Sequence, residues 1–443
     1  MQKSHLTTPT LALSIALLSL SALTARPAVA DEPGFTTLFN GKDFTNWHGE
    51  RTIDPRKFDA LSADEKAKTL AEDAEDVKKH WKVVDGELVN DGHGVFMTTD
   101  KDYGDVELFV DFKLLPKGDS GVYLRGTPQI QIWDTTEAAG YWKMGADKGS
   151  GGLWNNAAGS KGKDPIVLAD NPIGQWNTFR IIQLGARTTI YLNGKLVVQD
   201  AFLENYWDHA LPIVAKGPIQ LQTHGNEVRW RNIKVREIPA DEANAFLSKM
   251  DGGVGSFASL FNGKDLTGWA GAVANYEVKD GAIRCKPKSG GVLYFDKEYK
   301  DFIARVEFKL PPGGNNGLAI RYPGHGDAAY DGMTELQVLD TEHEMYKTID
   351  KRQAHGSAYG MVAAHRGYLR PTGEWNYQEV TVKGPKITVE LNGTPILNAD
   401  LSTVKEVLAN SPHPGKDRTS GFFGFAGHGD AVEFRDIFIK PLD

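Results

Sequence analysis

Seven polar residues in the C-terminal half stand where a strand pattern alone would not require them, so they are the first candidates for a functional site. Glu335 and Gln337 are two positions apart, and on a strand their side chains would share one face. The apolar residues Leu336 and Val338 would then take the opposite face. This pattern predicts a solvated, concave surface able to hold a polar ligand. The full set is Arg321, Glu335, Gln337, Asp340, His355, Tyr359 and His428.

These residue types leave a metal site open but define no familiar cofactor motif. One His, one Asp and one Glu could form a carboxylate-rich divalent metal site. The tight spacing of HExxH or of paired Cys ligands is absent from the sequence, as are a Walker loop, a dinucleotide fingerprint and a GxSxG elbow. We therefore expect no required cofactor and no hydride transfer, with a divalent metal as the open alternative.

The same residues also have structural interpretations. Arg321 could form a cross-strand ion pair with Glu335 or Asp340, and a His in an HG dipeptide, as at 428, could cap a turn. Asp340 follows the predicted strand, where a bulge could re-aim its side chain. Arg231 and Arg435 fit structural roles in the closing strands, and four tryptophans fit the core: Trp47, Trp176, Trp269 and Trp375.

The chain repeats itself at the scale of a whole domain. Five blocks recur in one order, which indicates a duplication. They are LFNGKDFTNW with LFNGKDLTGW, VDFKLLPKGDSGVYLR with VEFKLPPGGNNGLAIR, GQWN with GEWN, YLNGK with ELNGT, and GPIQLQTHG with GFFGFAGHG. In the first half, the counterparts of Arg321, Glu335, Gln337, Asp340 and His428 are Arg125, Gln129, Gln131, Asp134 and His224.

The repeated blocks predict strands and hairpins. Leu108, Val110 and Phe112 alternate with charged residues, which is the period of a half-buried strand. Asn193-Gly194 and Asn392-Gly393 each sit between apolar runs and predict two-residue turns. Many short strands with frequent turn signals predict an all-β chain of two tandem antiparallel β-sandwich domains.

Segments outside the blocks complete the expected organisation. Residues 1–30 read as a signal peptide, with a short apolar run and cleavage near Ala30, so we expect an exported periplasmic or extracellular protein without a transmembrane segment. A helical insertion is expected over 54–79, with Ser62 and Glu65 as a capping box. The two domains are expected at 31–240 and 256–443, joined by a Gly-rich, hinge-like linker at 241–255.

Composition narrows the class of partner. The 443 residues carry a formal net charge of −8, which argues against nucleic acid. Aromatic residues make up 10% of the chain and suit both sheet surfaces and sugar-stacking platforms. Cys285 is the only cysteine, so packed cores rather than disulfides must stabilise the domains. No oligomeric state is predicted.

The ordered blocks, from LFNGKDLTGW through GNNGLAIR, ELQVLD, GEWN and LNG to the closing HG, resemble the 3-keto-disaccharide hydrolase or 3-keto-glycoside lyase family in both halves. The resemblance implies concanavalin- or laminarinase-like jelly rolls that hold sugar on the concave face of one sheet. It also implies cleavage of 3-keto-glycosides, where the C3 ketone acidifies the C2 proton and elimination expels the glycosidic oxygen.

That chemistry needs a base and an enolate stabiliser. We expect His428 or Asp340 as the base and Arg321 as the stabiliser. The carbohydrate substrate is expected to be held by a second set of residues: Glu335, Gln337, Tyr359, His355, Arg125, Gln131, Asp134, His224 and Trp154. Trp133 and Trp142, like Trp154, occur only in the first half and could stack on a sugar ring. A lectin-like module without catalysis is the alternative; an ordinary retaining endo-glucanase lacks its ExDxxE constellation here.

Overall fold

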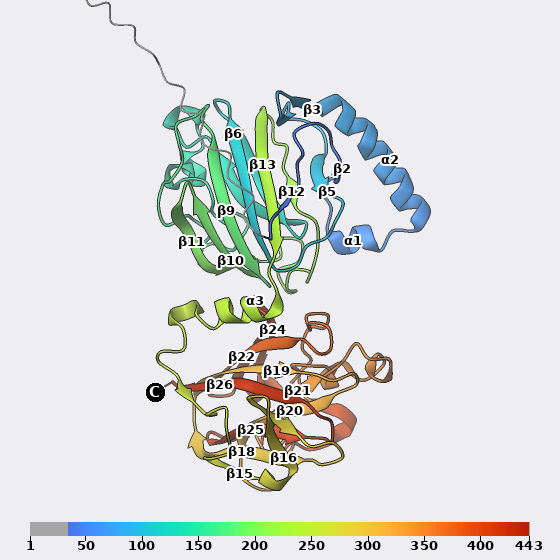
Figure 1. The fold of residues 1–443 in the computed structure, drawn as a ribbon, viewed down its shortest axis with the longest axis vertical. Coiled ribbons are helices and arrows are strands. Elements are labelled where there is room, and N and C mark those ends of the chain that lie inside the picture. The colour runs from blue at the N-terminus through green and yellow to red at the C-terminus, as the bar shows by residue number, and fades with distance from the viewer. Residues whose placement is uncertain (1–33, 443) are drawn as a thin grey trace, which may run out of the picture.

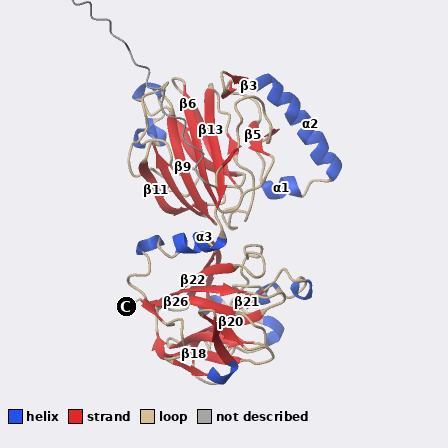
Figure 2. Cartoon of the chain, viewed as in Figure 1, coloured by secondary structure: helices blue, strands red, loops and turns tan. Residues whose placement is uncertain are grey.

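The computed structural model describes residues 34–442, which form two stacked β-sandwiches (Figure 1). The predicted signal peptide lies outside the described residues. Each sandwich pairs a larger sheet with a five-stranded sheet, and the strands of both are antiparallel neighbours. The predicted fold class of two tandem antiparallel sandwiches is confirmed, and strands dominate the chain (Figure 2).

The first sandwich contains strands β1 to β13. Its larger sheet has the order β11-β10-β9-β6-β13-β4-β3, with β1 paired to β13, and its smaller sheet has the order β2-β5-β12-β7-β8. The bounds are β1 Thr36–Thr37, β2 Trp47–Glu50, β3 Trp81–Val84, β4 Glu87–Asn90, β5 Phe96–Thr99, β6 Val106–Leu114, β7 Asp119–Leu124, β8 Thr127–Trp133, β9 Asn177–Leu184, β10 Arg187–Leu192, β11 Lys195–Phe202, β12 Gln220–Leu221 and β13 Val228–Glu237.

The second sandwich repeats this order. Its larger sheet runs β16-β17-β26-β19-β22-β23-β24, with β14 paired to β26, and its smaller sheet runs β15-β18-β25-β20-β21. The bounds are β14 Ala258–Ser259, β15 Trp269–Gly271, β16 Tyr276–Lys279, β17 Ala282–Cys285, β18 Gly291–Tyr299, β19 Phe302–Lys309, β20 Asn315–Tyr322, β21 Thr334–Leu339, β22 Trp375–Lys383, β23 Lys386–Leu391, β24 Thr394–Asp400, β25 Gly421–Gly427 and β26 Glu433–Pro441.

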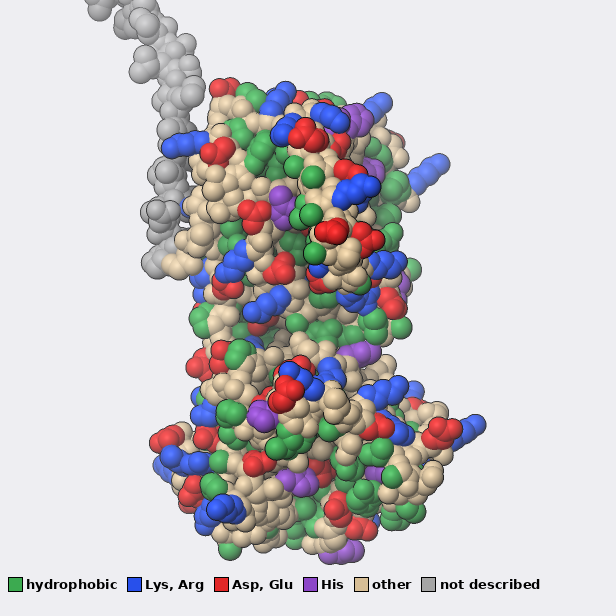
Figure 3. All heavy atoms as spheres, turned by 90° about the vertical axis from the view of Figure 1, so that its right-hand side faces the viewer, with side chains coloured by type: hydrophobic (Ala, Val, Ile, Leu, Met, Phe, Trp, Pro, Cys, Tyr) green, Lys and Arg blue, Asp and Glu red, His purple; other side chains and the backbone are tan. Residues whose placement is uncertain are grey.

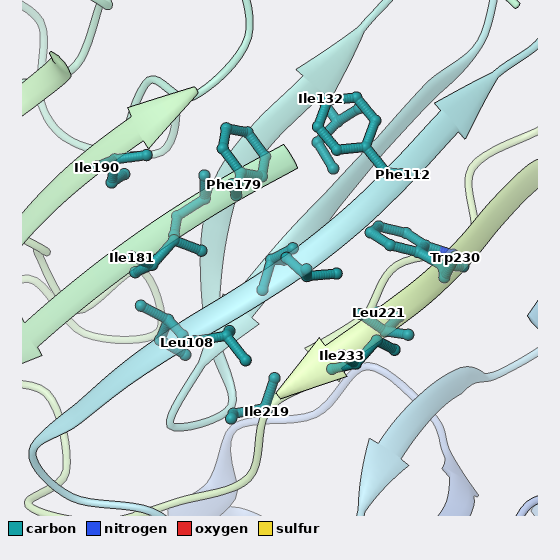
Figure 4. Packing of buried hydrophobic residues seen from close by; sticks show 14 of the residues in the cluster. Leu108, Phe112, Ile132, Phe179, Ile181, Ile190, Ile219, Leu221, Trp230 and Ile233 are labelled. Carbon is teal, nitrogen blue, oxygen red and sulfur yellow. The ribbon is translucent and has the colours of Figure 1, made fainter. Parts of the chain in front are cut away.

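A separate hydrophobic core fills each sandwich. In the first, Phe112 of β6 lies near Trp230 of β13 and Ile132 of β8, and Leu108 of the same strand lies beside Ile181 of β9 (Figure 4). The alternating apolar residues of β6 face the core, as the period of two predicts, but the strand is not half-exposed because Glu107 and Asp111 on its other face are buried as well. Burying each apolar core side chain contributes about 1.5–3 kcal/mol. These cores hold the outer faces of the smaller sheets in place.

Two helices, rather than one, occupy the predicted insertion. These are α1 (Pro55–Asp59) and α2 (Ala63–His80), and the predicted capping box of Ser62 and Glu65 is present at the start of α2. The longer helix packs beside β2, where a Cβ on Gly49 would lie only 2.3 Å from Val77 Cγ2. A glycine is therefore needed for this close approach of helix and strand.

The linker expected at 241–255 begins with a helix that packs between the sandwiches (Figure 1). Helix α3 (Ala240–Leu247) buries Ala243 and Leu247 in a small cluster with residues of β9 and β22. Arg187 also crosses the interface to Glu390, with Nε–Oε1 at 2.6 Å and Nη2–Oε2 at 2.7 Å, both side chains nearly buried. The Gly-rich residues follow this helix, but the segment before them is held by both halves.

Two of the four predicted core tryptophans, Trp176 and Trp375, are only half-buried. Trp47 and Trp269 are buried, as expected. Trp176 instead lies under Arg231, whose guanidinium is 4.0 Å from the ring centroid, and Trp375 lies under Arg435 at 4.1 Å. Cation–π contact outside the larger sheets, rather than core burial, explains this recurring Trp. The two arginines have the structural role expected of them.

Candidate functional site

A pocket of about 230 Å³ opens on the outer face of the five-stranded sheet of the second sandwich. It lies over the ends of β20, β21 and β25, which are adjacent in the sheet. This volume fits a small polar ligand better than an extended polymer. The lining residues are Asn315, Asp327, Ala329, Tyr330, Glu335, Gln337, Leu339, Tyr346, Ile349, Gln353, Tyr359 and His428.

A buried carboxylate bonded to a histidine forms the centre of this pocket. Glu335 Oε1 lies 3.1 Å from His428 Nε2, and the Glu335 side chain is almost fully buried while that of His428 is 42% exposed. The Gln337 amide, oriented by its hydrogen-bond surroundings, donates to Glu335 Oε1 and to the Asn316 carbonyl, both at 3.1 Å. The predicted shared face of Glu335 and Gln337 is therefore present, and His428 joins it.

Gly317 allows the carboxylate to reach the histidine. Strand β20 separates β21, which carries Glu335, from β25, after which His428 follows. A Cβ built on Gly317 would lie 2.2 Å from both Cγ and Oε1 of Glu335. The Glu335 side chain thus crosses β20 at the one point where that strand has no side chain in the way.

Burial and pairing change the acidity of both groups. The hydrogen bond that His428 donates to Glu335 raises the pKa of His428 above its usual value, because a negatively charged acceptor favours the imidazolium. Burial raises the pKa of Glu335, and the His428 contact offsets this only in part. The contact thus favours the protonated form of His428, and burial favours the neutral form of Glu335.

Aromatic hydroxyl groups form one wall of the pocket. Tyr330 and Tyr359 meet edge to face with ring centroids 6.2 Å apart, and Tyr359 Oη accepts a hydrogen bond from Gln353 Nε2 at 3.1 Å. Burial raises the pKa of Tyr330 and of Tyr346, so these phenols stay neutral at physiological pH. The wall therefore offers neutral hydrogen-bond donors beside the histidine.

Several pocket residues were not among the sequence candidates. Asn315 begins β20, and its buried Oδ1 has no hydrogen-bond partner within residues 34–442. Asp327 and Tyr330 come from a loop present only in the second copy: Glu335 follows Arg321 by fourteen positions, whereas Gln129 follows Arg125 by four. That insertion was the available sequence signal. The others missed are Tyr346, Gln353, Ala329, Leu339 and Ile349.

Two proposed catalytic residues serve the backbone instead. Arg321 is 1% exposed and donates to the carbonyls of Lys300, Gly384 and Arg418 and to Asp301 Oδ1, so its guanidinium is occupied away from the pocket. Asp340 Oδ2 accepts from Gly313 N at 2.9 Å and holds the turn between β19 and β20. The expectations of Arg321 as oxyanion stabiliser and Asp340 as base are not supported by these positions.

His355 is a core residue rather than a substrate ligand. Its Nδ1 accepts from Leu339 N, its Nε2 lies 3.0 Å from Gln378 Oε1, and its ring stacks on Phe308. Burial lowers the pKa of His355 to about 3, so the ring is neutral. Of the second-half candidates, the structure brings Glu335, Gln337, Tyr359 and His428 together.

The first sandwich arranges its counterparts differently. Gln129 stands where Glu335 does, and its amide bonds to Gln131, which in turn donates to Asp119 Oδ1 at 2.7 Å. His224 Nδ1 lies 3.3 Å from Asp119 Oδ2, with 61% of its side chain exposed. A His–carboxylate pair therefore recurs, but its carboxylate comes from β7, at the position occupied by Asn315 in the second copy.

The remaining first-half candidates are dispersed. Asp134 accepts from Lys117 N and Thr136 N and so caps a turn, and it lines a pocket of about 220 Å³ together with Trp133. The Trp154 ring packs edge to face against that of Trp133 at 6.5 Å. Arg125 lies at the boundary of the two sandwiches, away from Gln131 and His224. The structure does not gather this set into one site.

Neither a cluster of metal ligands nor a membrane-spanning helix occurs within residues 34–442. No three or more His, Cys, Asp or Glu side chains in this range are grouped to hold a metal ion. No helix in this range has both the length and the apolar character needed to cross a bilayer. Acidic and basic side chains are interspersed over the face shown in Figure 3.

Comparison with known proteins identifies the family. The family described as the 3-keto-alpha-glucoside-1,2-lyase-like domain matches residues 34–236 and again residues 256–440. These two matches cover most of the chain. The chain belongs to this family and carries two copies of its domain, which confirms the resemblance found in the paired sequence blocks.

The chain is also similar to several individual proteins. A protein of Bacteroides thetaiotaomicron named 3-keto-disaccharide hydrolase is 26% identical over 271 aligned residues, covering 51% of this chain and 91% of that protein. A crystal structure of a candidate glycosyl hydrolase from Parabacteroides distasonis is 27% identical, covering 42% of this chain and 94% of that one, with a TM-score of 0.37. The Bacillus subtilis carbohydrate-binding module CBM66 is 12% identical, covering 39% and 96%, with a TM-score of 0.28.

Proposed function

We propose that the second sandwich cleaves 3-keto-glycosides and that His428 is the base. The observation that carries this proposal is the buried Glu335 carboxylate bonded to a partly exposed His428 within a pocket. Family membership and the name of the Bacteroides relative support the substrate class. The enzyme is expected to act on the glycosidic bond of an oxidised disaccharide.

The reaction begins at C2 of the sugar. The C3 ketone makes the C2 proton acidic enough for an imidazole to remove. The C2–H electron pair forms an enolate, the C1–O bond breaks, and the leaving oxygen takes a proton from a pocket donor or water. Later addition of water across the new double bond would give the products of hydrolysis. Two opposed carboxylates, as in ordinary glycosidases, are not needed.

Glu335 has the properties needed to prepare His428 for this step. Its carboxylate faces Nε2, which fixes that nitrogen as the N–H donor and leaves Nδ1 to accept the proton. The same contact raises the pKa of His428 and so increases its basicity. A buried partner that orients a histidine in this way resembles the arrangement of catalytic triads.

Neutral donors replace Arg321 as the enolate stabilisers in this proposal. The hydroxyls of Tyr330, Tyr346 and Tyr359 line the pocket and can donate to the ketone oxygen as negative charge develops there. Asn315 Oδ1, buried and without a partner among the described residues, can accept from a sugar hydroxyl. The pocket therefore supplies donors and acceptors of the kinds that a keto-sugar needs.

A panel of 3-keto-disaccharides and matched unoxidised disaccharides tests the proposal. We expect cleavage of keto-sugars only, because the C2 proton of a plain glycoside is far too weakly acidic for imidazole. Comparable cleavage of unoxidised sugars would contradict elimination. Saturable glycan binding without turnover of any keto-sugar would instead support the lectin-like alternative. A parallel series with chelator, followed by metal addition, shows whether a divalent metal takes part.

A further inference from the structure

A second cavity, of about 450 Å³, lies between the two sandwiches and is separate from the pocket around His428. Both halves line it: residues 104–105, 125, 185, 215–216 and 237–240 come from the first sandwich and α3, and residues 367–371, 374, 392 and 394 come from the second. A volume of this size is typical of sites for small organic ligands.

The duplication supplies an internal reference for Arg125, which lines this cavity. Its counterpart Arg321 uses its guanidinium fully, donating from Nε to Lys300 O at 2.8 Å and from Nη1 to Gly384 O at 2.9 Å and Arg418 O at 2.8 Å. Asp301 Oδ1 lies 2.8 Å from Nη2. In the second sandwich, the N–H groups of the arginine at this position therefore find their acceptors within the same sandwich.

Arg125 forms fewer hydrogen bonds than Arg321 does. Its Nη1 donates to Val214 O at 3.2 Å, and its Nη2 lies 3.3 Å from Asp105 Oδ1. Its Nε is buried and has no hydrogen-bond partner among the described residues, although the side chain is 2% exposed. A buried guanidinium N–H without an acceptor is costly. The Nε–H of Arg125 is without an acceptor among the described residues, whereas the Nε–H of Arg321 donates to Lys300 O.

Three basic and three acidic residues line the cavity, and two of the basic ones share one carboxylate. Asp105 lies between two guanidiniums, with Arg125 Nη2 and Arg370 Nη2 each 3.3 Å from one of its oxygens. Lys216 adds a further cation at the exposed rim. Two more acids line the cavity: Glu237 is half exposed and paired with Lys101, and Glu374 is exposed to water. The Asp105 carboxylate is thus shared by two guanidiniums.

We propose that the cavity binds a small oxyanion ligand, either an organic carboxylate such as a sugar acid or a phosphate. Guanidinium groups bind both through paired N–H donors. The ligand would supply the acceptor that Arg125 Nε lacks and would lie beside Arg370, which shares the Asp105 carboxylate with Arg125. Because both sandwiches line the cavity, the bound ligand would also join the two halves. This inference does not depend on the chemistry at His428.

Calorimetric titration of the full chain with gluconate, inorganic phosphate and glucose tests the proposal. We expect saturable binding of one ligand per chain for at least one oxyanion and none for glucose. Preference for gluconate identifies the carboxylate class, and preference for phosphate identifies the phosphate class. Melting temperature should rise by several degrees at saturation, because only the folded chain binds.

Three variants locate the site. Arg125→Gln should weaken binding about tenfold or more, as expected for loss of a charged hydrogen bond. Lys216→Gln, at an exposed position that leaves the fold intact, should weaken it to a smaller degree. Arg284→Gln, which makes the same change of charge on β17 of the second sandwich, should leave it unchanged. Absence of saturable oxyanion binding by the native chain, equal binding of glucose, or unchanged affinity in both cavity variants would overturn the proposal.

Discussion

The polar faces of the two five-stranded sheets each carry a His–carboxylate pair, but the carboxylate comes from a different strand in each. In the second sandwich, Glu335 of β21 crosses β20 at Gly317 to reach His428. In the first, Gln129 replaces that carboxylate, and Asp119 on the strand next to His224 supplies it instead. Both copies thus have a His–carboxylate pair, but the carboxylate lies on β21 in the second sandwich and on β7 in the first.

The exchange alters the chemistry that each histidine can perform. Glu335 contacts His428 through Nε2, whereas Asp119 contacts His224 through Nδ1, so the two rings leave opposite nitrogens free. The loop that brings Asp327 and Tyr330 to the second pocket is absent from the first copy. We therefore expect cleavage to belong to the second sandwich, and four predictions test this comparison.

The largest expected effect separates the two histidines. His428→Gln should lower kcat/KM for a 3-keto-disaccharide by about 10²–10⁴, the usual contribution of a general base. The matched change His224→Gln should leave turnover within about twofold, because on this account general-base catalysis resides at His428 alone. Steady-state kinetics of both variants measure this. Equal losses would mean that both sandwiches catalyse the reaction.

The second prediction moves the carboxylate. Glu335→Gln should lower kcat/KM by about 10², since a buried carboxylate that orients a catalytic histidine contributes at least this much in triads. Adding Asn315→Asp recreates the arrangement of the first copy, in which the carboxylate contacts Nδ1 of the histidine. The double variant should therefore recover none of that loss, because Nδ1 is the nitrogen that must accept the proton; recovery of activity would show that a carboxylate on β20 can replace the one on β21.

Glycine substitutions probe the crossing point. Gly317→Ala places a Cβ 2.2 Å from Glu335 Cγ and must displace that side chain, which we expect to cost about 1–3 kcal/mol of stability along with most of the activity. At Gly121 the nearest atom would be 3.0 Å away, so Gly121→Ala should cost less than about 1 kcal/mol. Thermal unfolding of the two variants checks the difference, and equal costs would contradict it.

The smallest effect is a shift in pH dependence. The proposed base must be neutral, so kcat/KM should rise with pH through the His428 pKa, which the Glu335 contact raises above its usual value near 6.5. Glu335→Gln removes the charge that favours the imidazolium, and the acidic limb should move to lower pH. The measurement is the pH profile of residual activity; a limb that stays in place would show that another group titrates.

Much of this architecture could be predicted from the sequence because it depends on local periodicity. Alternation in β6, the capping box of α2, the duplicated blocks and the shared face of Glu335 and Gln337 are all visible in short segments. His428 was identified because an HG dipeptide recurs in both copies. Local pattern and repeat comparison therefore located the centre of the pocket.

Tertiary contacts determine the roles of several polar residues that the sequence alone could not assign. Arg321, Asp340 and His355 look like functional polar residues, but distant backbone carbonyls, a neighbouring turn and a buried glutamine use their hydrogen bonds. No pattern of residue types in the sequence shows which polar side chains will form their hydrogen bonds within the fold and so be unable to bind substrate. The repeated Trp176 and Trp375 are a similar case, because the arginines that cover them come from another strand.

Hydrogen exchange at C2 tests the central claim most directly. In deuterated water, the native enzyme should place deuterium at C2 of recovered 3-keto-disaccharide or show a primary isotope effect with C2-deuterated substrate, because proton removal there starts the reaction. The His428→Gln variant should lose this signal and His224→Gln should keep it. Cleavage with neither exchange nor an isotope effect, or exchange undiminished in His428→Gln, would contradict the assignment of His428 as the base that removes the C2 proton.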